Sequence, residues 1–146
     1  PNPPVVQFTS VGRKDSLRNI EATGEFVINL ATAHMVELIN ASSAGYEHGV
    51  SELEALGIAS EPSEKVAPPR VAESPVAIEA TLHRIIEVGN SFVVMGRVVA
   101  IAVRPEFLAA DGLPSFEAIA PLSRLGRTEW GMPPEVRTID RPGVPT

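Results

Sequence analysis

The strongest constraint on the fold is a pair of long segments with alternating apolar residues, 76–88 and 91–103, separated by Gly89 and Asn90. In the first segment the even positions are apolar except for Arg84, and several odd positions, such as Glu79, are polar. A period of two is typical of a strand with one buried and one solvated face. Gly-Asn reverses the favoured order of a type I′ turn but still permits a tight connection. The two segments are therefore expected to form a long antiparallel hairpin.

The second of these segments is apolar on both faces. Phe92 and Val94 alternate with Val93 and Met95, and the pattern continues through residues 98–101. A strand with two apolar faces is covered on both sides. One face is expected to pack on the core, and the other on a helix or on a second subunit.

Shorter elements surround this hairpin. Gly24 stands where a left-handed helix C-cap is needed, and Ser51-x-x-Glu54 is a weak capping box. Residues 61–75 contain four prolines and are predicted to form a loop without regular structure. The spacing predicts strands over 5–11 and 26–30, helices over 15–23, 33–42 and 51–56, and a short helical segment over 115–120. This pattern favours a mainly β fold, a small barrel decorated by helices, in a single domain over residues 1–146.

Composition excludes several classes of function. The formal net charge of −6 argues against nucleic acid as a partner, and the absence of cysteine excludes thiolate metal sites and cysteine nucleophiles. The three histidines share no metal-ligand spacing, so no metal site is predicted. No apolar stretch approaches a membrane span and no secretion signal is visible, so a cytoplasmic protein is expected. A nicotinamide site of the Rossmann kind is excluded because Gly-x-Gly-x-x-Gly does not occur.

One segment carries a candidate ligand site. Residues 10–21, which follow the expected first strand, contain Gly12, then the cations Arg13 and Lys14, then Asp15 and Ser16 at the start of the expected helix. A helix N-terminus presents unpaired N–H groups and the positive end of the helix dipole, and both favour an anion. The two cations and the serine hydroxyl add charge-assisted donors. The segment therefore predicts a phosphate cradle, the alternative being an ordinary helix capped by Asp15 and Ser16 with two solvated cations.

Residues for acid–base or nucleophilic chemistry do not form a recognisable constellation. Trp130 offers a planar platform for a ring, or else packs in a core or an interface. A phosphate cradle without catalytic groups of its own fits a domain in which a bound cofactor performs the chemistry. In a small antiparallel barrel, a phosphate-bearing cofactor suggests FMN.

The same residues carry a resemblance to a known family. After Asn2-Pro3-Pro4 and the expected strand, residues 12–29 read Gly-Arg-Lys-Asp-Ser-Leu-Arg-Asn-Ile-Glu-Ala-Thr-Gly-Glu-Phe-Val-Ile-Asn. This run resembles, almost residue for residue, that of the flavin reductase-like family with the FMN-binding split-barrel fold. Residues 51–53, 96–99 and 121–126, followed by an aromatic residue, resemble its later segments.

The resemblance implies a homodimeric split β-barrel with a few short helices and flavin sites near the subunit interface. Such an enzyme reduces bound FMN with NADH or NADPH, and passes the electrons to free flavin or to a partner monooxygenase. Alternatives on the same fold are a non-catalytic flavin carrier and a reductase of metal or oxygen. No catalytic residue is assigned. The candidate cofactor-binding residues are Ser10, Gly12, Arg13, Lys14, Asp15, Ser16, Arg124 and Trp130.

The chain departs from the family pattern at its start. Family members carry a further strand pair before Asn-Pro-Pro, and this pair supplies much of the contact to the isoalloxazine and ribityl groups. The resemblance therefore implies that roughly 40 to 60 residues precede Pro1 in the natural protein. Without these strands the barrel is expected to expose an edge.

Overall fold

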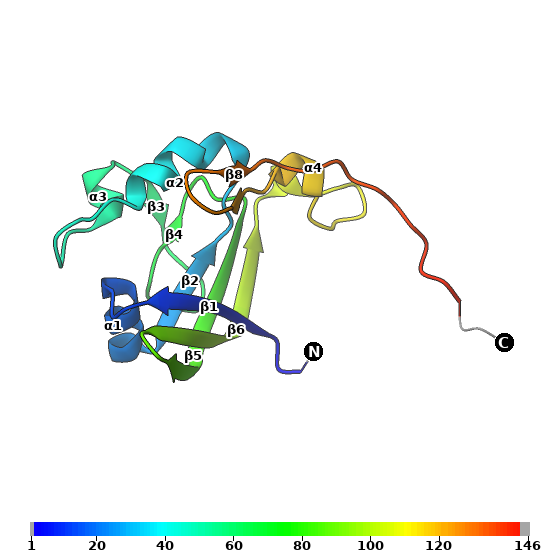
Figure 1. The fold of residues 1–146 in the computed structure, drawn as a ribbon. Helices are drawn as coiled ribbons and strands as arrows, with labels where there is room; N and C mark the ends of the chain where they lie inside the picture. Colours follow the sequence, from blue (N-terminus) through cyan, green and yellow to red (C-terminus); the bar gives the residue numbers. More distant parts are fainter. Residues whose placement is uncertain (1, 144–146) are drawn as a thin grey trace.

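The computed structural model describes residues 2–143. Its main element is a curled antiparallel sheet in the order β1 (Val5–Val11), β6 (Ser91–Val103), β5 (Val76–Val88) and β2 (Glu25–Asn29), shown in Figure 1. Two small antiparallel pairs accompany it, β3 (Ser60–Glu61) with β4 (Arg70–Val71), and β7 (Ser123–Arg124) with β8 (Trp130–Gly131). The predicted mainly β split-barrel fold is confirmed, with the long β5–β6 hairpin at its centre.

Short helices decorate the sheet. They are α1 (Asp15–Thr23), η1 (Ala33–Met35), α2 (Val36–Ser42), α3 (Glu52–Ala55), η2 (Pro105–Phe107) and α4 (Phe116–Ile119). Gly24 adopts the left-handed conformation predicted for the α1 C-cap, with φ of 73°, and its N–H donates to the Ile20 carbonyl. Ser51 caps α3 by accepting from the Glu54 N–H, also as predicted. The helix expected over 33–42 opens with a 3-10 turn before it becomes α-helical.

The core lies where α1 packs on the concave side of the sheet. Its buried members are Leu17, Ile20, Phe26, Ala80, Phe92 and Val94. A Cβ atom at Gly96 would lie 2.3 Å from the Phe26 ring, so this position requires glycine for close approach. Register shifts in the β5–β6 pairing, between Glu79 and Ala80 and between Leu82 and Arg84, accompany the curl of the sheet.

The polar face of β5 differs from the sequence-based expectation. Glu79, expected to be solvated, is fully buried, because the segment between β3 and β4 lies across this face and donates backbone N–H groups to its carboxylate. Part of residues 61–75 is also regular, since Glu61 pairs with Arg70 and Ser60 with Val71. The alternation of apolar and polar residues in β5 could not reveal that a segment outside this strand covers its polar face.

The two faces of β6 differ in burial. Phe92 and Val94 are buried, whereas Val99 and Ile101 remain 40% and 60% exposed. Within residues 2–143 nothing covers the exposed pair fully. In the same described part of the chain, the outer edges of β1 and β2 carry no further strand.

Candidate functional site

The turn between β1 and α1 is held by its own backbone and one hydroxyl. Gly12 adopts φ of 77°, which favours glycine, and its N–H donates to the Asn90 carbonyl at 2.8 Å. Ser10 is buried, and its hydroxyl donates to the Gly12 carbonyl at 2.9 Å. Both predicted site residues therefore shape the turn, and the Ser10 hydroxyl proton points into it.

The two cations of the turn have different surroundings. The Arg13 guanidinium forms an ion pair with Glu21, with Nη1 and Oε2 2.6 Å apart, and lies 5.0 Å from the Phe92 ring centroid. Lys14 is exposed, and within residues 2–143 it forms no ion pair. Lys14 is thus the cation that can meet a ligand without giving up a partner.

The N-terminus of α1 lacks the predicted cap. Lys14, in extended conformation, occupies the N-cap position and makes no side-chain cap, so the expectation that Asp15 or Ser16 caps this helix is wrong. The first intrahelical bond runs from the Arg18 N–H to the Lys14 carbonyl. The N–H groups ahead of it have no partner within the helix, which leaves the positive end of the dipole open to an anion.

Asp15 instead ties a neighbouring loop to α1. Its carboxylate accepts from the Gly49 N–H at 2.9 Å, lies 2.5 Å from His48 Nδ1, and stands 3.7 Å from Arg18 Nη1. The Gly49 hydrogen bond, followed by the contacts with His48 and Arg18, lowers the pKa of Asp15 below its usual value. The loop over residues 45–50 is thereby fixed beside the helix N-terminus.

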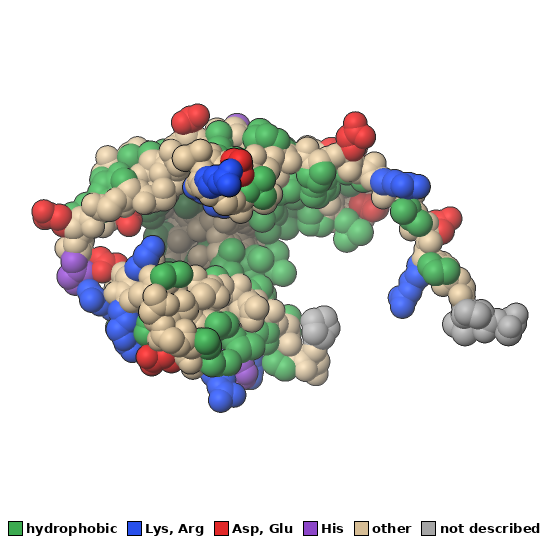
Figure 2. Space-filling model, viewed as in Figure 1, with side chains coloured by type: hydrophobic (Ala, Val, Ile, Leu, Met, Phe, Trp, Pro, Cys, Tyr) green, Lys and Arg blue, Asp and Glu red, His purple; other side chains and the backbone are tan. Residues whose placement is uncertain are grey.

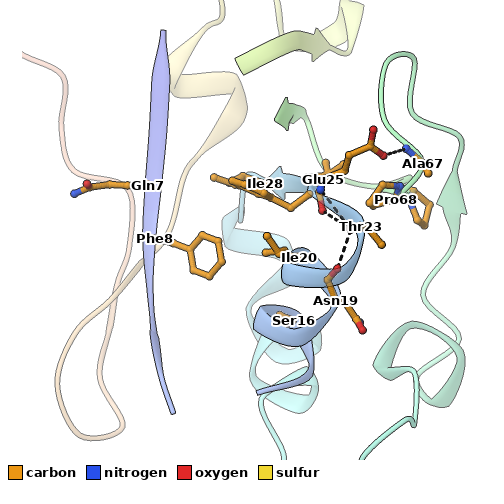
Figure 3. A pocket seen from close by; sticks show the side chains of 13 residues that line it. Gln7, Phe8, Ser16, Asn19, Ile20, Thr23, Glu25, Ile28, Ala67 and Pro68 are labelled. Atoms are coloured by element: carbon orange, nitrogen blue, oxygen red, sulfur yellow. Dashed lines mark hydrogen bonds between the residues drawn. The ribbon is translucent and has the colours of Figure 1, made fainter. Parts of the chain in front are cut away.

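A pocket of about 780 Å³ begins next to this turn (Figure 3). The side chains of Ser16, Asn19 and Thr23 form a polar stripe along one side of α1, while Phe8 reaches in from β1. The remaining wall comes from β2 and from the segment between β3 and β4. The lining residues are Gln7, Phe8, Ser16, Asn19, Ile20, Thr23, Glu25, Phe26, Val27, Ile28, Ala67, Pro68 and Pro69.

Arg124 and Trp130 come together, but apart from the turn. They are paired residues of the β7–β8 hairpin, and the guanidinium lies 5.1 Å from the Trp130 ring centroid. Arg124 also donates to the carbonyls of Glu129 and Arg127. Figure 1 places β8 on the opposite side of the molecule from α1, and Figure 2 shows a deep hollow between the two parts. The predicted site residues thus form two clusters on opposite sides of this hollow.

Sequence reasoning missed most of the pocket. Asn19 and Thr23 follow Ser16 at helical spacing, so the polar stripe could have been found from the helix prediction alone. Gln7, Glu25 and residues 67–69 gave no such signal, because they come from β1, β2 and the segment between β3 and β4, which only folding brings beside α1. No helix within residues 2–143 has the length and apolar character needed to cross a membrane.

Comparison with known proteins gives a consistent result. A family model described as flavin reductase like domain matches residues 2–114. An uncharacterised protein of Halalkalibacterium halodurans is 34% identical over 154 residues, which cover 97% of this chain and 73% of the relative.

Two solved structures extend the likeness to the fold. Nitrilotriacetate monooxygenase component B from Bacillus cereus is 28% identical, with a TM-score of 0.88 over 94% of this chain and 73% of that one. The 2-nitrobenzoate 2-nitroreductase of Pseudomonas fluorescens is 27% identical, with a TM-score of 0.87 over 99% and 73%.

Proposed function

Because this chain belongs to the flavin reductase-like family, we propose that it binds FMN and acts as an NAD(P)H-dependent oxidoreductase. The observation that carries the proposal is the N-terminus of α1, which has no side-chain cap and adjoins a pocket of about 780 Å³. Lys14 stands beside it and forms no ion pair within residues 2–143. A phosphate group fits this arrangement, since it supplies the charge that both the helix dipole and the lysine favour. The polar stripe of α1 continues from there into the pocket.

Each residue of the turn then has a defined task. Lys14, the Ser16 hydroxyl and the free N–H groups of α1 hold the phosphate. Arg13 adds positive potential from its place over Phe92, while Gly12 and Ser10 keep the turn in shape. Asp15 orients the start of α1 through the loop at Gly49.

The pocket and the hollow supply the rest of the proposed site. Asn19 and Thr23 offer donors and acceptors to the ribityl chain, and the apolar side chains that line the pocket exclude water. Trp130, braced by Arg124, offers a flat surface to the flavin ring or the nicotinamide from the opposite side of the hollow. When bound, the flavin supplies the chemistry that the side chains lack, accepting hydride from the nicotinamide and passing electrons onward.

A second copy of the chain and an electron acceptor complete the proposal. The exposed Val99 and Ile101 favour a homodimer that covers this face of β6. Free flavin or a partner monooxygenase is the proposed acceptor. The likeness to a protein described as a monooxygenase component supports the second choice.

Visible absorption of the purified protein tests the proposal. FMN is added first, and then NADPH or NADH without oxygen. Flavin bands that shift on binding and bleach with the reductant are expected. Bands that shift but do not bleach would indicate a flavin carrier. The absence of any shift would refute flavin binding and leave α1 as an ordinary helix.

A further inference from the structure

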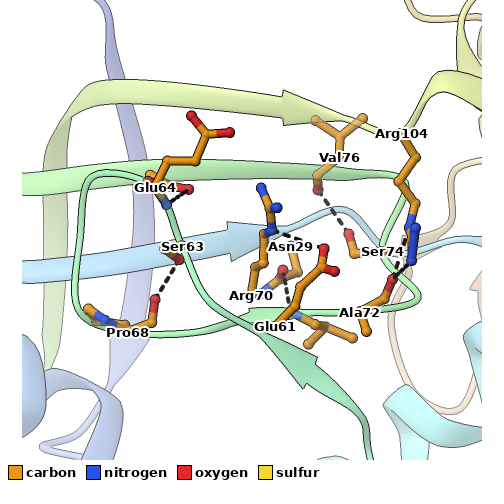
Figure 4. A network of polar contacts seen from close by, with 12 residues as sticks. Asn29, Glu61, Ser63, Glu64, Pro68, Arg70, Ala72, Ser74, Val76 and Arg104 are labelled. Atoms are coloured by element: carbon orange, nitrogen blue, oxygen red, sulfur yellow. Dashed lines mark hydrogen bonds and ion pairs between the residues drawn. The ribbon is translucent and has the colours of Figure 1, made fainter.

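A proline-rich strap crosses the sheet and reaches the pocket. We define the strap as residues 61–72, which run from the end of β3 through β4 and lie across β2 and β5 (Figure 4). Glu61 and Arg70 form an ion pair across its base, with Oε1 and Nε 3.0 Å apart. The Ser63 hydroxyl donates to the Pro68 carbonyl, and the Arg104 guanidinium donates to the Ala72 carbonyl. The far turn of the strap contributes Ala67, Pro68 and Pro69 to the pocket wall.

Side-chain oxygens of the sheet hold the strap along its length. Glu25 and Asn29 of β2 accept from the N–H groups of Ala67 and Val71, at 2.8 and 3.0 Å. Glu79 of β5 accepts from two successive N–H groups, with Oε1 2.9 Å from Glu64 N and Oε2 2.7 Å from Lys65 N. This double contact lies two residues before Ala67, the first residue of the strap that lines the pocket.

Glu79 is an unusual anchor because its side chain is fully buried and no cation of residues 2–143 pairs with it. Burying a carboxylate is costly unless hydrogen bonds compensate for the lost water. Here the two backbone N–H groups of the strap provide that compensation. The strap and the carboxylate therefore stabilise each other.

We propose that Glu79 is a positioning residue of the flavin site, acting through the strap without contact to the ligand. Its carboxylate fixes Glu64 and Lys65, so that the two prolines that follow stand as a rigid wall opposite the polar stripe of α1. The inference rests on the proposed function, because it assigns the pocket to the flavin.

Glu79→Gln tests this role with almost no change in side-chain volume. The amide NH₂ group of glutamine replaces one of the two carboxylate oxygens and faces a backbone N–H of the strap. One hydrogen bond to the strap is therefore lost, and two hydrogen-bond donors face each other instead. We expect FMN affinity, measured by quenching of flavin fluorescence, to fall by about tenfold or more. Hydrogen exchange at residues 64–67 should accelerate by a similar factor, roughly tenfold.

Two controls separate positioning from loss of stability. Glu64→Gln changes an exposed side chain on the strap itself and should leave both FMN affinity and exchange unchanged. Met35→Ala removes a buried side chain outside the pocket. This variant should have a lower Tm but the same FMN affinity as the wild-type protein. If Glu79→Gln fails to fold, Pro69→Gly loosens the strap directly and should also weaken FMN binding.

The outcomes are distinct. Faster strap exchange with weaker FMN binding supports the role. Wild-type FMN affinity in Glu79→Gln or Pro69→Gly would overturn it while leaving the proposed function intact. A wild-type protein that does not bind FMN would refute the proposed function together with the positioning role, whatever the exchange rates show.

Discussion

Replacing Lys14 with alanine should weaken FMN binding without destabilising the protein. Lys14 is exposed and pairs with no other side chain of residues 2–143, so its removal breaks no ion pair in that part of the chain. A hydrogen bond to a charged group contributes about 1.5–3 kcal/mol. Screening by salt at this exposed position reduces the contribution of Lys14 to FMN binding to about 1.4 kcal/mol. Its loss corresponds to about a tenfold rise in the Kd for FMN. The Tm of the flavin-free protein should stay unchanged.

Arg13→Ala provides the contrast within the same turn. Its guanidinium pairs with Glu21 and lies over Phe92, so this substitution should lower the Tm as well as the affinity for FMN. An exposed ion pair contributes about 0.2–1 kcal/mol and an exposed cation–π contact about 0.5–1 kcal/mol. The expected loss of stability is therefore about 0.7–2 kcal/mol.

Fluorescence titration with FMN and with riboflavin is the decisive assay. Riboflavin has the same ring and ribityl chain but no phosphate, so Lys14→Ala should leave its affinity unchanged. The difference in FMN affinity between the wild-type protein and Lys14→Ala should shrink as the salt concentration rises, since an exposed charge is screened. Equal weakening of both ligands, or of neither, would show that Lys14 does not meet the phosphate.

Three further outcomes are expected. Since the pKa of Asp15 is lowered in the folded protein, its tie to Gly49 should be fully present above the usual carboxyl pKa and lost as the pH falls through the lowered value. The protection of the loop amides against hydrogen exchange, measured relative to their intrinsic rates, should then fall only in acid. The Asp15→Asn substitution should lower this protection already at neutral pH. Gly96→Ala forces a Cβ against Phe26 and should lower the free energy of unfolding by about 1–3 kcal/mol, as measured by thermal unfolding. The control Gly45→Ala places a Cβ where no atom lies within 4 Å and should leave the stability unchanged. Ile101→Lys should turn a dimer into a monomer in sedimentation analysis. A dimer that survives this change would place the interface away from this face of β6.

Local signals in the sequence predicted the elements well. The β1 strand, α1 with its glycine C-cap and the β5–β6 hairpin all follow from alternation, helical spacing and turn residues. These depend on neighbours within a few positions, and so a single sequence reveals them. The resemblance carried by residues 12–29 added the family, which the comparisons confirm.

The arrangement of the candidate site depended on contacts between distant parts of the chain. The sequence placed Asp15 in the turn but could not show that its carboxylate accepts from Gly49. Glu79 was expected in water, whereas the strap covers this residue. Neither partner could be inferred, because each lies on a loop far from its acceptor in sequence, and only the folded chain brings the two together.

The sequence by itself therefore determined the β1 strand, the β5–β6 hairpin, α1, the turn at Gly12 and the family. Only the tertiary structure decided which of the charged residues remain free. Lys14 and Arg13 are adjacent in sequence and equal in charge, but Glu21 and Phe92 contact Arg13, whereas Lys14 forms no ion pair within residues 2–143. Local pattern fixes backbone conformation, whereas the free charge of a side chain depends on what folding brings within a few ångströms of it.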